Sequence, residues 1–351
     1  MRILHILNHT LRLSGNVHAA IDVSCAQSNN GHDVAMCSGG GNFDQILKNN
    51  KVTLIEIDQK RKVFTLIKAS WKLYKFCKTW KPQLIHAHMM TSGVLAWPVT
   101  RILKIPLVTT VHNEFEKSSI LMGLGDRVIA VSRVVKASMI KRGISEKRLR
   151  IVLNGTVGSA RLPIPAPDPK QLKHPAIVFV GGLHPRKGVP DLMNAFRQIY
   201  EKHTEANLYI VGEGPYSKEY AKLSQDLNIA DRVHFIGALN DPRSYLRAAD
   251  IFVLASYSDP APLVLSEARE AGCAIIATEV DGIPQLLDNG EAGILVPPAR
   301  PDKIAEALSS LIESPEKLEK YKQLSLSNLE NLSVNRVAIE TVSIYQECIS
   351  I

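Results

Sequence analysis

The sequence predicts an α/β protein made of two Rossmann-like, doubly wound domains, each built on a parallel β-sheet. Short apolar runs alternate with helix-length amphipathic segments along the 351 residues. Near-continuous hydrophobic runs are typical of strands that helices cover on both faces. Their alternation with helices indicates right-handed βαβ units. A chain of this length is also too long for one ordinary hydrophobic core.

Thirteen apolar runs are the expected strands, seven in the first half of the chain and six in the second. In the first half they are Arg2–Leu7, Asp33–Cys37, Thr53–Ile55, Leu84–His86, Leu107–Val111, Arg127–Val131 and Arg150–Leu153. In the second half they are Ala176–Val180, Asn207–Val211, Arg232–Ile236, Ile251–Leu254, Ala274–Ala277 and Gly293–Val296. Ligands are expected at the carboxyl ends of these strands, in a cleft between the two domains.

A proline-rich stretch separates the two halves. Pro163, Pro165, Pro167, Pro169 and Pro175 fall where periodicity is weak. We therefore expect an N-terminal Rossmann-like domain over residues 1–162, a linker over 163–175 and a C-terminal Rossmann-like domain over 176–334. Helices are expected over 302–312, 315–329 and 334–349, and the last segment, 335–351, is expected to cross back to the N-terminal domain.

Composition excludes several classes of protein. Hydrophobic residues make up 45% and charged residues 22% of the chain, which are ordinary globular values. No apolar run reaches the ~20 residues that span a bilayer, and the N-terminal run resembles a strand rather than a signal peptide. The five cysteines include no C-x-x-C pair, which argues against a disulfide framework or a zinc site and favours a cytoplasmic location.

The positive charge of the chain is concentrated in its first half. Residues 1–161 carry 24 Lys and Arg against 9 Asp and Glu, a net charge of +15, whereas residues 162–351 carry a net −7. This imbalance favours an anionic partner, such as a membrane surface or a phosphate-bearing substrate. Nucleic acid is not expected as a partner, because no recognised nucleic-acid-binding module is present.

The segment Lys60–Lys81 combines basic and aromatic residues. It contains eight Lys and Arg and no acid. Its aromatic residues are Phe64, Trp71, Tyr74, Phe76 and Trp80. The pattern predicts a basic amphipathic helix with two open interpretations. The helix either docks on anionic lipid, or is an ordinary βαβ helix with its lysines in water.

Two loops that follow expected strands have residue types suited to phosphate. Gly15 stands where the first loop enters a helix, so a phosphate could approach backbone N–H groups there. That loop lacks the G-x-G-x-x-G fingerprint, which weighs against an NAD enzyme. In the second half, Arg186 and Lys187 precede Gly188 and a helix, and adjacent cations could neutralise a leaving diphosphate. Each loop alone is also compatible with an ordinary connection.

Glycines also follow a strand at Gly212-Glu213-Gly214, where they permit close approach of a ligand. The alternative is a tight turn before a helix that begins at Pro215.

Two carboxylates bracket a predicted helix start. Asp259 and Glu267 are eight residues apart, and Pro262 between them is expected at the first helical position. Carboxylates suit sugar or ribose hydroxyls because they offer several acceptor positions. Alternatively, Asp259 is only an acid near a helix start.

The order and spacing of these segments resemble glycosyltransferase family 4, the large retaining GT-B family. The resemblance covers nearly the whole chain. In the second half it lies in Asp259-x7-Glu267, residues 268–273 and 278–284, Gly188, Val211-Gly212-Glu213-Gly214-Pro215, residues 232–237 and residues 249–253. In the first half it lies in residues 31–34, Ile85-His86-Ala87-His88, Thr110-Val111-His112, residues 128–132 and Asn154-Gly155.

The resemblance implies a role for each matching residue. Lys187 would hold the departing diphosphate, Glu267 the donor ribose and Asp259 the sugar, while His112 would lie near the transferred sugar. The implied donor-binding residues are Gly15, Arg186, Lys187, Gly212, Glu213, Asp259, Leu263, Val264 and Glu267. The implied catalytic residues are His112, Lys187, Asp259 and Glu267, and the implied acceptor-binding residues are Asn16, His112 and Asn113. Taken alone, His112 is also compatible with a core histidine at a strand end.

Three positions depart from the family pattern. Gly182 stands where the family usually has Arg, and Asp259 is one methylene shorter than the usual Glu. Pro260-Ala261-Pro262 replaces Gly-Phe-Gly, so backbone donors are lost, although Leu263 and Val264 keep theirs. These departures leave the identity of the donor sugar open.

We therefore expect a retaining, metal-independent glycosyltransferase without a cofactor. It would move a hexose-type sugar from a UDP donor, rather than GDP, to a hydroxyl of a glycan or lipid-linked glycan. The expected setting is bacterial surface polysaccharide synthesis (O-antigen, capsule or lipopolysaccharide), in the cytoplasm or peripherally on the inner face of the cytoplasmic membrane. The alternatives are a nucleotide-sugar epimerase of the same architecture and a catalytically silent GT-B subunit.

Overall fold

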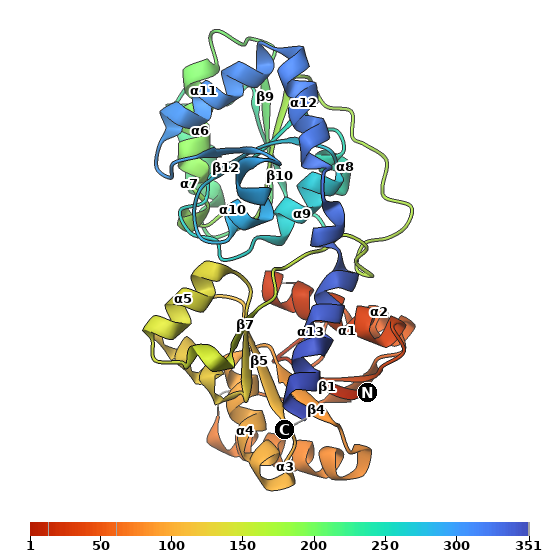
Figure 1. Cartoon of the computed structure of the whole chain (residues 1–351). Coiled ribbons are helices and arrows are strands. Elements are labelled where there is room, and N and C mark those ends of the chain that lie inside the picture. Colours follow the sequence, from red (N-terminus) through yellow and green to blue (C-terminus); the bar gives the residue numbers. More distant parts are fainter. Residues whose placement is uncertain (13, 61, 350–351) are drawn as a thin grey trace. The chain divides into compact units, whose positions relative to one another are not determined.

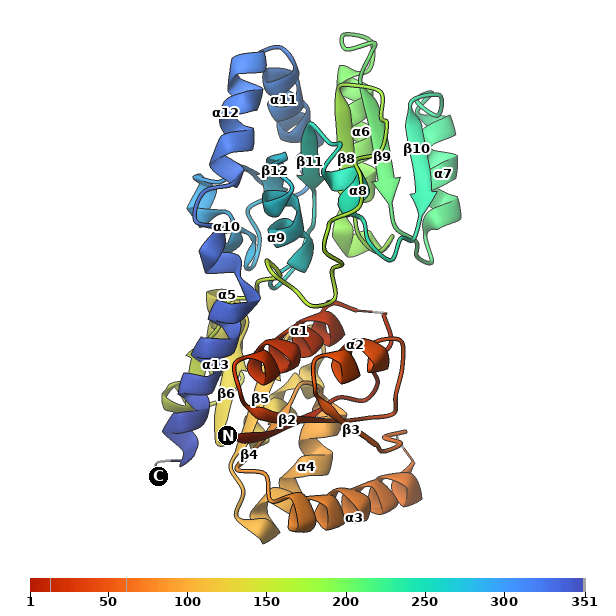
Figure 2. The same ribbon diagram turned by 90° about the vertical axis from the view of Figure 1, so that its right-hand side faces the viewer.

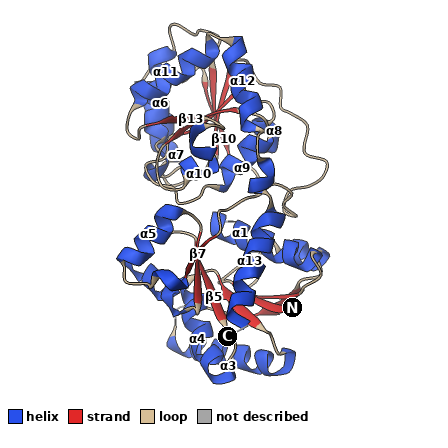
Figure 3. Ribbon diagram, in the orientation of Figure 1, coloured by secondary structure: helices blue, strands red, loops and turns tan. Residues whose placement is uncertain are grey.

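The computed structural model describes residues 1–12, 14–60 and 62–349, so Arg61 of the basic segment and Leu13 of the first loop lie outside the described residues. The chain divides into two compact units, Met1–Arg161 with Glu330–Ile351 (unit 1) and Leu162–Leu329 (unit 2). Figure 1 shows the course of the chain and Figure 3 shows the helices and strands of each unit.

Unit 1 contains a seven-stranded parallel sheet in the order β3-β2-β1-β4-β5-β6-β7. Its strands are β1 (Arg2–Ile6), β2 (Asp33–Ser38), β3 (Thr53–Glu56), β4 (Leu84–Ala87), β5 (Leu107–Val111), β6 (Arg127–Ala130) and β7 (Leu149–Ile151). Its helices are α1 (Gly15–Asn29), α2 (Asp44–Asn49), α3 (Val63–Trp80), α4 (Met90–Leu103), α5 (Arg133–Lys141) and α13 (Val334–Ile349), with 3-10 helices η1 (Lys117–Leu124) and η2 (Glu146–Arg148). The seven strands predicted for this half are confirmed, each within two residues at its ends.

Alternate residues of each strand supply the two faces of this sheet. Leu4 and Ile6 of β1 belong to the core that α3 and α4 cover, whereas Ile3 belongs to the core under α13. Figure 2 shows α1 and α2 on the opposite side of the strands from α3 and α4. A buried position on either face therefore needs an apolar or hydrogen-bonded side chain, which explains the near-continuous hydrophobic runs.

The helix α13 packs beside α1 within unit 1 (Figure 1). Tyr345 is fully buried in the core under this helix. Glu347 fixes the last turn of α13 to the sheet, because its carboxylate pairs with Arg150 of β7 at 2.6 Å and with Arg127 of β6 at 3.2 Å. The C-terminal segment is thus fixed to the same sheet as the N-terminal strands.

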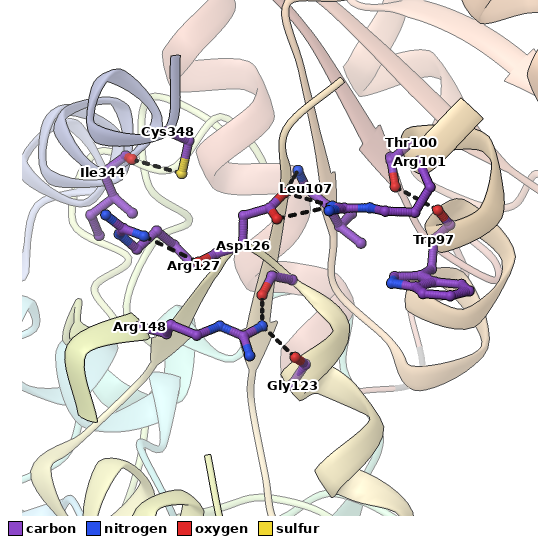
Figure 4. Close-up of polar contacts among 11 residues, drawn as sticks. Trp97, Thr100, Arg101, Leu107, Gly123, Asp126, Arg127, Arg148, Ile344 and Cys348 are labelled. Atoms are coloured by element: carbon purple, nitrogen blue, oxygen red, sulfur yellow. Dashed lines mark hydrogen bonds and ion pairs between the residues drawn. The ribbon is translucent and has the colours of Figure 1, made fainter. Parts of the chain in front are cut away.

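Arginines also hold the amino-terminal ends of the strands of this sheet in place (Figure 4). The carboxylate of Asp126 accepts two hydrogen bonds from Arg101, at 2.8 and 2.9 Å, and one from the backbone N–H of Leu107. Arg148 donates to the backbone carbonyl of Gly123. The cations at this edge are therefore engaged in holding loops and strand ends.

Unit 2 contains a six-stranded parallel sheet in the order β10-β9-β8-β11-β12-β13. Its strands are β8 (Ala176–Val180), β9 (Asn207–Val211), β10 (Val233–Gly237), β11 (Ile251–Leu254), β12 (Ala274–Thr278) and β13 (Ile294–Val296). Its helices are α6 (Val189–Ile199), α7 (Ser217–Asp226), α8 (Arg243–Leu246), α9 (Leu263–Glu270), α10 (Ile283–Leu286), α11 (Pro301–Ile312) and α12 (Pro315–Ser325), with 3-10 helices η3 (Pro185–Lys187) and η4 (Asp288–Gly290). A further 3-10 turn, η5 (Leu329–Leu332), lies at the boundary of the units. The six strands predicted for this half are also confirmed.

The proline-rich stretch, residues 163–175, is hydrogen-bonded to α8 within unit 2. Arg243 of α8 donates to the carbonyl of Pro163 at 2.8 Å, and Arg247 donates to that of Pro167 at 2.6 Å. The backbone N–H of Lys170 donates to Ser244 at 2.9 Å. These contacts hold the segment expected as a linker to α8 and to Arg247, the residue after it.

Among the described residues, no helix is both long enough and apolar enough to cross a bilayer.

Candidate active site

The loop after β8 places two cations at the start of a helix. Lys187 ends the turn η3, and Gly188 then leads directly into α6. Gly188 has a left-handed φ of 62°, and a Cβ there would lie 1.9 Å from the carbonyl oxygen of Ala255. Only glycine fits this close approach, which brings the loop after β8 against the end of β11.

The same approach joins Lys187 to Asp259. The Lys187 ammonium forms an ion pair with the Asp259 carboxylate, and their side chains are only 11% and 9% exposed. Arg186 lies 4.0 Å from the other carboxylate oxygen and donates to the carbonyl of Ser258 at 3.2 Å. Three of the residues predicted to handle the donor therefore form one cluster. A diphosphate would compete with Asp259 for Lys187.

Asp281 positions Asp259, a role that the sequence analysis did not assign. Its carboxylate accepts from the backbone N–H of Asp259 at 2.7 Å and from the Ser258 hydroxyl at 2.5 Å. Asp281 has a left-handed φ of 48°, which Asp tolerates better than most residues. The sequence signal was the Asp281-Gly282 turn after β12, but the turn alone does not identify its partner.

Gly212 and Glu213 lie beside the loop that contains Gly182. The backbone N–H of Leu183 donates to the carbonyl of Glu213 at 3.0 Å. Gly212 has a φ of 140°, and a Cβ there would lie 1.9 Å from the carbonyl oxygen of Gly181. The structure thus brings the glycine-rich ends of β8 and β9 together, as expected for neighbouring parallel strands.

The remaining predicted donor residues lie on α9. This helix begins at Leu263, so Pro262 is its N-cap rather than its first residue, which corrects the prediction by one position. The N–H groups of Leu263 and Val264 are in the first turn, where a helix has no acceptor of its own to offer them. Glu267 is one turn further on and 8% exposed.

Unit 1 contains a polar cavity of about 200 Å³ at the carboxyl ends of β1, β4 and β5. The three predicted acceptor-binding residues, Asn16, His112 and Asn113, all line it. Asn16 directly follows Gly15, the first residue of α1. The cavity therefore gathers the three predicted acceptor-binding residues in one place, whereas Gly15 does not line it.

A chain of buried histidines leads to this cavity. His5 donates a 2.8 Å hydrogen bond from Nε2 to the side-chain oxygen of Gln27, and its Nδ1 pairs with Nε2 of His88 at 2.9 Å. His88 then pairs with His112 at 3.3 Å. His86 lies beside them and bonds to Tyr345 and Thr110. Strand register explains the grouping, since His5 of β1 lies opposite His86 of β4.

These imidazoles are held in the neutral state. Burial lowers the pKa of His5 and of His112 to about 4. Burial also lowers the pKa values of His86 and His88 well below the usual value, and the neighbouring imidazoles lower them further. The Nδ1 atom of His112 is buried without a hydrogen-bond partner. At neutral pH, His112 therefore offers a hydrogen bond rather than a charge to whatever occupies the cavity.

Nitrogen atoms of His5, His86 and His88 lie within 4.8 Å of one another, a spacing that a metal ion could use. The hydrogen bonds just described already engage both nitrogens of each of these rings. The network thus accounts for the three residues without a metal, and metal independence stays a prediction.

Two parallel-sheet Rossmann-like units are the architecture of GT-B glycosyltransferases. Residues 15–157 match the model of Glycosyltransferase Family 4, and residues 163–325 match that of Glycosyl transferases group 1. The chain therefore belongs to this family of glycosyltransferases, and it is an enzyme of the transferase class.

Similar proteins agree with this assignment. The D-inositol 3-phosphate glycosyltransferase of Corynebacterium efficiens is 26% identical over 304 residues, which are 75% of this chain and 71% of that protein. The structure of HepE from Anabaena in complex with UDP matches with a TM-score of 0.82 at 18% identity, covering 99% of this chain and 100% of that chain. The lipopolysaccharide outer core galactosyltransferase WaaB matches with a TM-score of 0.77 at 18% identity, covering 99% and 100%. At these identities the two structures show the shared fold.

Proposed function

We propose that this glycosyltransferase transfers a hexose-type sugar from a UDP donor to a hydroxyl of a glycan or lipid-linked glycan, with retention at the anomeric carbon and without a metal ion. The observation that carries the proposal is the cluster of Lys187, Arg186 and Asp259 at the end of β8, next to the start of α6. HepE of Anabaena, which shares the fold, has been solved with UDP and with UDP-glucose.

The chemistry of the cluster follows from its charges. The bond between the anomeric carbon and the diphosphate oxygen would break, and the acceptor oxygen would form the new bond as its proton passes to the departing diphosphate. Negative charge grows on the departing diphosphate, where Lys187 and Arg186 would stabilise it. Asp259 would then turn from Lys187 to a sugar hydroxyl. Lysine and arginine would serve in place of a divalent cation.

The polar cavity of unit 1 would receive the acceptor. Asn16 and Asn113 offer amide groups, and neutral His112 offers a hydrogen bond without a charge. A role in bacterial surface polysaccharide synthesis is part of the proposal, supported by the shared fold of a lipopolysaccharide galactosyltransferase.

Glu267→Ala should weaken UDP binding at least ~10-fold, because a buried carboxylate that holds the ribose hydroxyls contributes about 1.5–3 kcal/mol. Isothermal titration with UDP, in the presence of a chelator, measures the change. Glu270→Ala, at an exposed position of the same helix, is the matched control and should bind UDP as the wild type does. Equal affinity of the Glu267→Ala variant and the control would remove the ribose role.

We also propose that α3 docks the enzyme on an anionic membrane surface. Phe64, Ile67 and Trp71, one helical turn apart, are 82%, 60% and 58% exposed. Lys75 lies over the Trp71 ring at 5.1 Å and Lys78 over the Tyr74 ring at 5.8 Å. Ala69, Leu73 and Cys77 pack on the sheet, so the aromatic and basic stripe is a separate face of the helix.

Charge reversal on this stripe tests the docking. Lys75→Glu with Lys78→Glu should lower partitioning onto vesicles containing phosphatidylserine at least ~10-fold, since each basic residue near the surface contributes about 1 kcal/mol. Co-sedimentation measures the bound fraction. Lys141→Glu with Lys147→Glu is the control of equal charge in the same unit, at exposed positions outside α3. Negligible pelleting of the wild type on anionic vesicles contradicts the docking.

Two alternatives differ in simple assays. An epimerase would convert a UDP-sugar without any acceptor, whereas the proposed transferase would leave it unconverted apart from slow hydrolysis. A silent subunit is motivated by Gly182 and the Pro260-Ala261-Pro262 segment. It would bind UDP weakly or not at all, would need a partner and would show no transfer by itself.

A further inference from the structure

Unit 1 contains an apolar groove that the proposed reaction does not use. The groove has a volume of about 600 Å³ and lies between α3, α4 and η1. Leu66 and Ile67 of α3, Val94 and Leu95 of α4 and Leu121 of η1 line it. Three of these apolar side chains are largely open to solvent, with Ile67 60%, Val94 42% and Leu121 42% exposed. An exposed apolar groove of this kind is a candidate for ligand or membrane contact.

The groove adjoins the polar cavity of the same unit. Met90 and Thr91, at the start of α4, line both spaces. Beyond them the cavity is lined by His112, Asn16 and Asn113. A single ligand could therefore place a polar end at His112 and an apolar chain between α3 and α4.

The positive charge of α3 favours an anionic ligand. Ile67 of the groove lies on the same helix as Lys68, Lys75 and Lys78, and this helix has no acidic residue. The helix also exposes Phe64 and Trp71, which suit the boundary between headgroups and acyl chains.

We propose that this groove binds the hydrocarbon chain of a lipid-linked acceptor whose sugar lies towards the His112 cavity. The inference rests on the proposed function and names its acceptor class: a sugar or glycan carried on a phosphorylated long-chain lipid. The chain would enter from the membrane on which α3 docks. The groove would hold the chain while the acceptor hydroxyl lies in the polar cavity.

The test compares two ligands with the same head and different chains. Dodecyl phosphate, kept below its micelle concentration, should bind the full-length protein at least ~10-fold more tightly than butyl phosphate, because each buried methylene contributes about fourfold in affinity. Isothermal titration measures both affinities. The variant Ile67→Asn with Leu121→Asn should lose most of this preference. Both positions are partly exposed, so the changes add polar groups at the surface rather than in the core.

Ile102→Asn is the matched control, because Ile102 is 68% exposed on α4 and does not line the groove. It should keep the chain-length preference. Equal binding of the two phosphates by the wild type overturns the proposal. So does an unchanged preference in the groove variant, or an equal loss in Ile102→Asn, which would indicate adsorption over the whole surface. UDP affinity in the same samples reports the proposed function separately, because the predicted nucleotide residues Lys187 and Glu267 belong to unit 2.

Discussion

Lys187→Ala should lower kcat about 100- to 1,000-fold at saturating donor, the loss found when one preorganised group that stabilises developing charge is removed. The Lys187 ammonium is largely buried and lies beside Arg186 and Asp259 at the start of α6. Removing it leaves the departing diphosphate without its nearest cation and leaves Asp259 without its ion-pair partner. Release of UDP in a coupled assay measures the rate.

The control for this variant is Lys218→Ala, which removes an exposed lysine of the same unit on α7. We expect it to keep the wild-type rate. A thermal melt of both variants separates lost chemistry from lost folding. Turnover of a folded Lys187→Ala variant near the wild-type value would exclude the leaving-group role of Lys187.

The free energy of unfolding of unit 1 should fall steeply as the pH is lowered from 6.5 to 4. The pKa of His5 falls from 6.5 to about 4 in the folded protein because the ring is buried. In this window His5 binds a proton in the unfolded chain but not in the folded chain. Its contribution to the free energy of unfolding is therefore complete above pH 6.5 and is lost as the pH falls to 4. For His5 alone the loss amounts to about 3 kcal/mol. The lowered pKa values of His86, His88 and His112 act in the same direction.

Urea unfolding at a series of pH values measures this effect. The three tryptophans, Trp71, Trp80 and Trp97, all lie in unit 1, so their fluorescence reports its unfolding separately from unit 2. His5→Gln should reduce the slope of stability against pH by about 1.4 kcal/mol per pH unit in this window. His184→Gln, at an exposed position of unit 2, should leave it unchanged. A flat pH profile in the wild type would show that the imidazoles are not desolvated as described.

The strands could be predicted because their burial on both faces is recorded in uninterrupted apolar runs. Leu107–Val111 and Ile251–Leu254 were predicted to the residue. The start of α9 was predicted one residue early. Proline is most common at the first helical position, but Pro262 is the N-cap of this helix.

The side-chain partnerships of the site could not be predicted, because they join distant parts of the chain. Lys187 and Asp259 meet across 72 residues through the close approach at Gly188. The histidine chain depends on the register of β1 against β4, which places His5 opposite His86. The sequence showed His86, His88 and His112 as separate motif residues, and it carried no signal that His5 joins them.

The apolar groove also depends on packing that the sequence does not record. The pattern of Lys60–Lys81 predicted an amphipathic helix, and α3 confirms it. Which apolar residues face the sheet was not evident. Leu73 and Cys77 pack in the core, whereas Leu66 and Ile67 line the groove with α4 and η1.

Titration of the wild-type protein with UDP, in a chelator and without added metal, tests the central claim most directly. We expect saturable one-site binding of UDP that depends on Lys187 and Glu267, and we expect UDP-sugars to bind at the same site. Absence of UDP binding without metal, followed by its appearance when Mg²⁺ or Mn²⁺ is added, would contradict the metal-independent donor site. Absence of binding under both conditions would contradict UDP as the nucleotide of the donor.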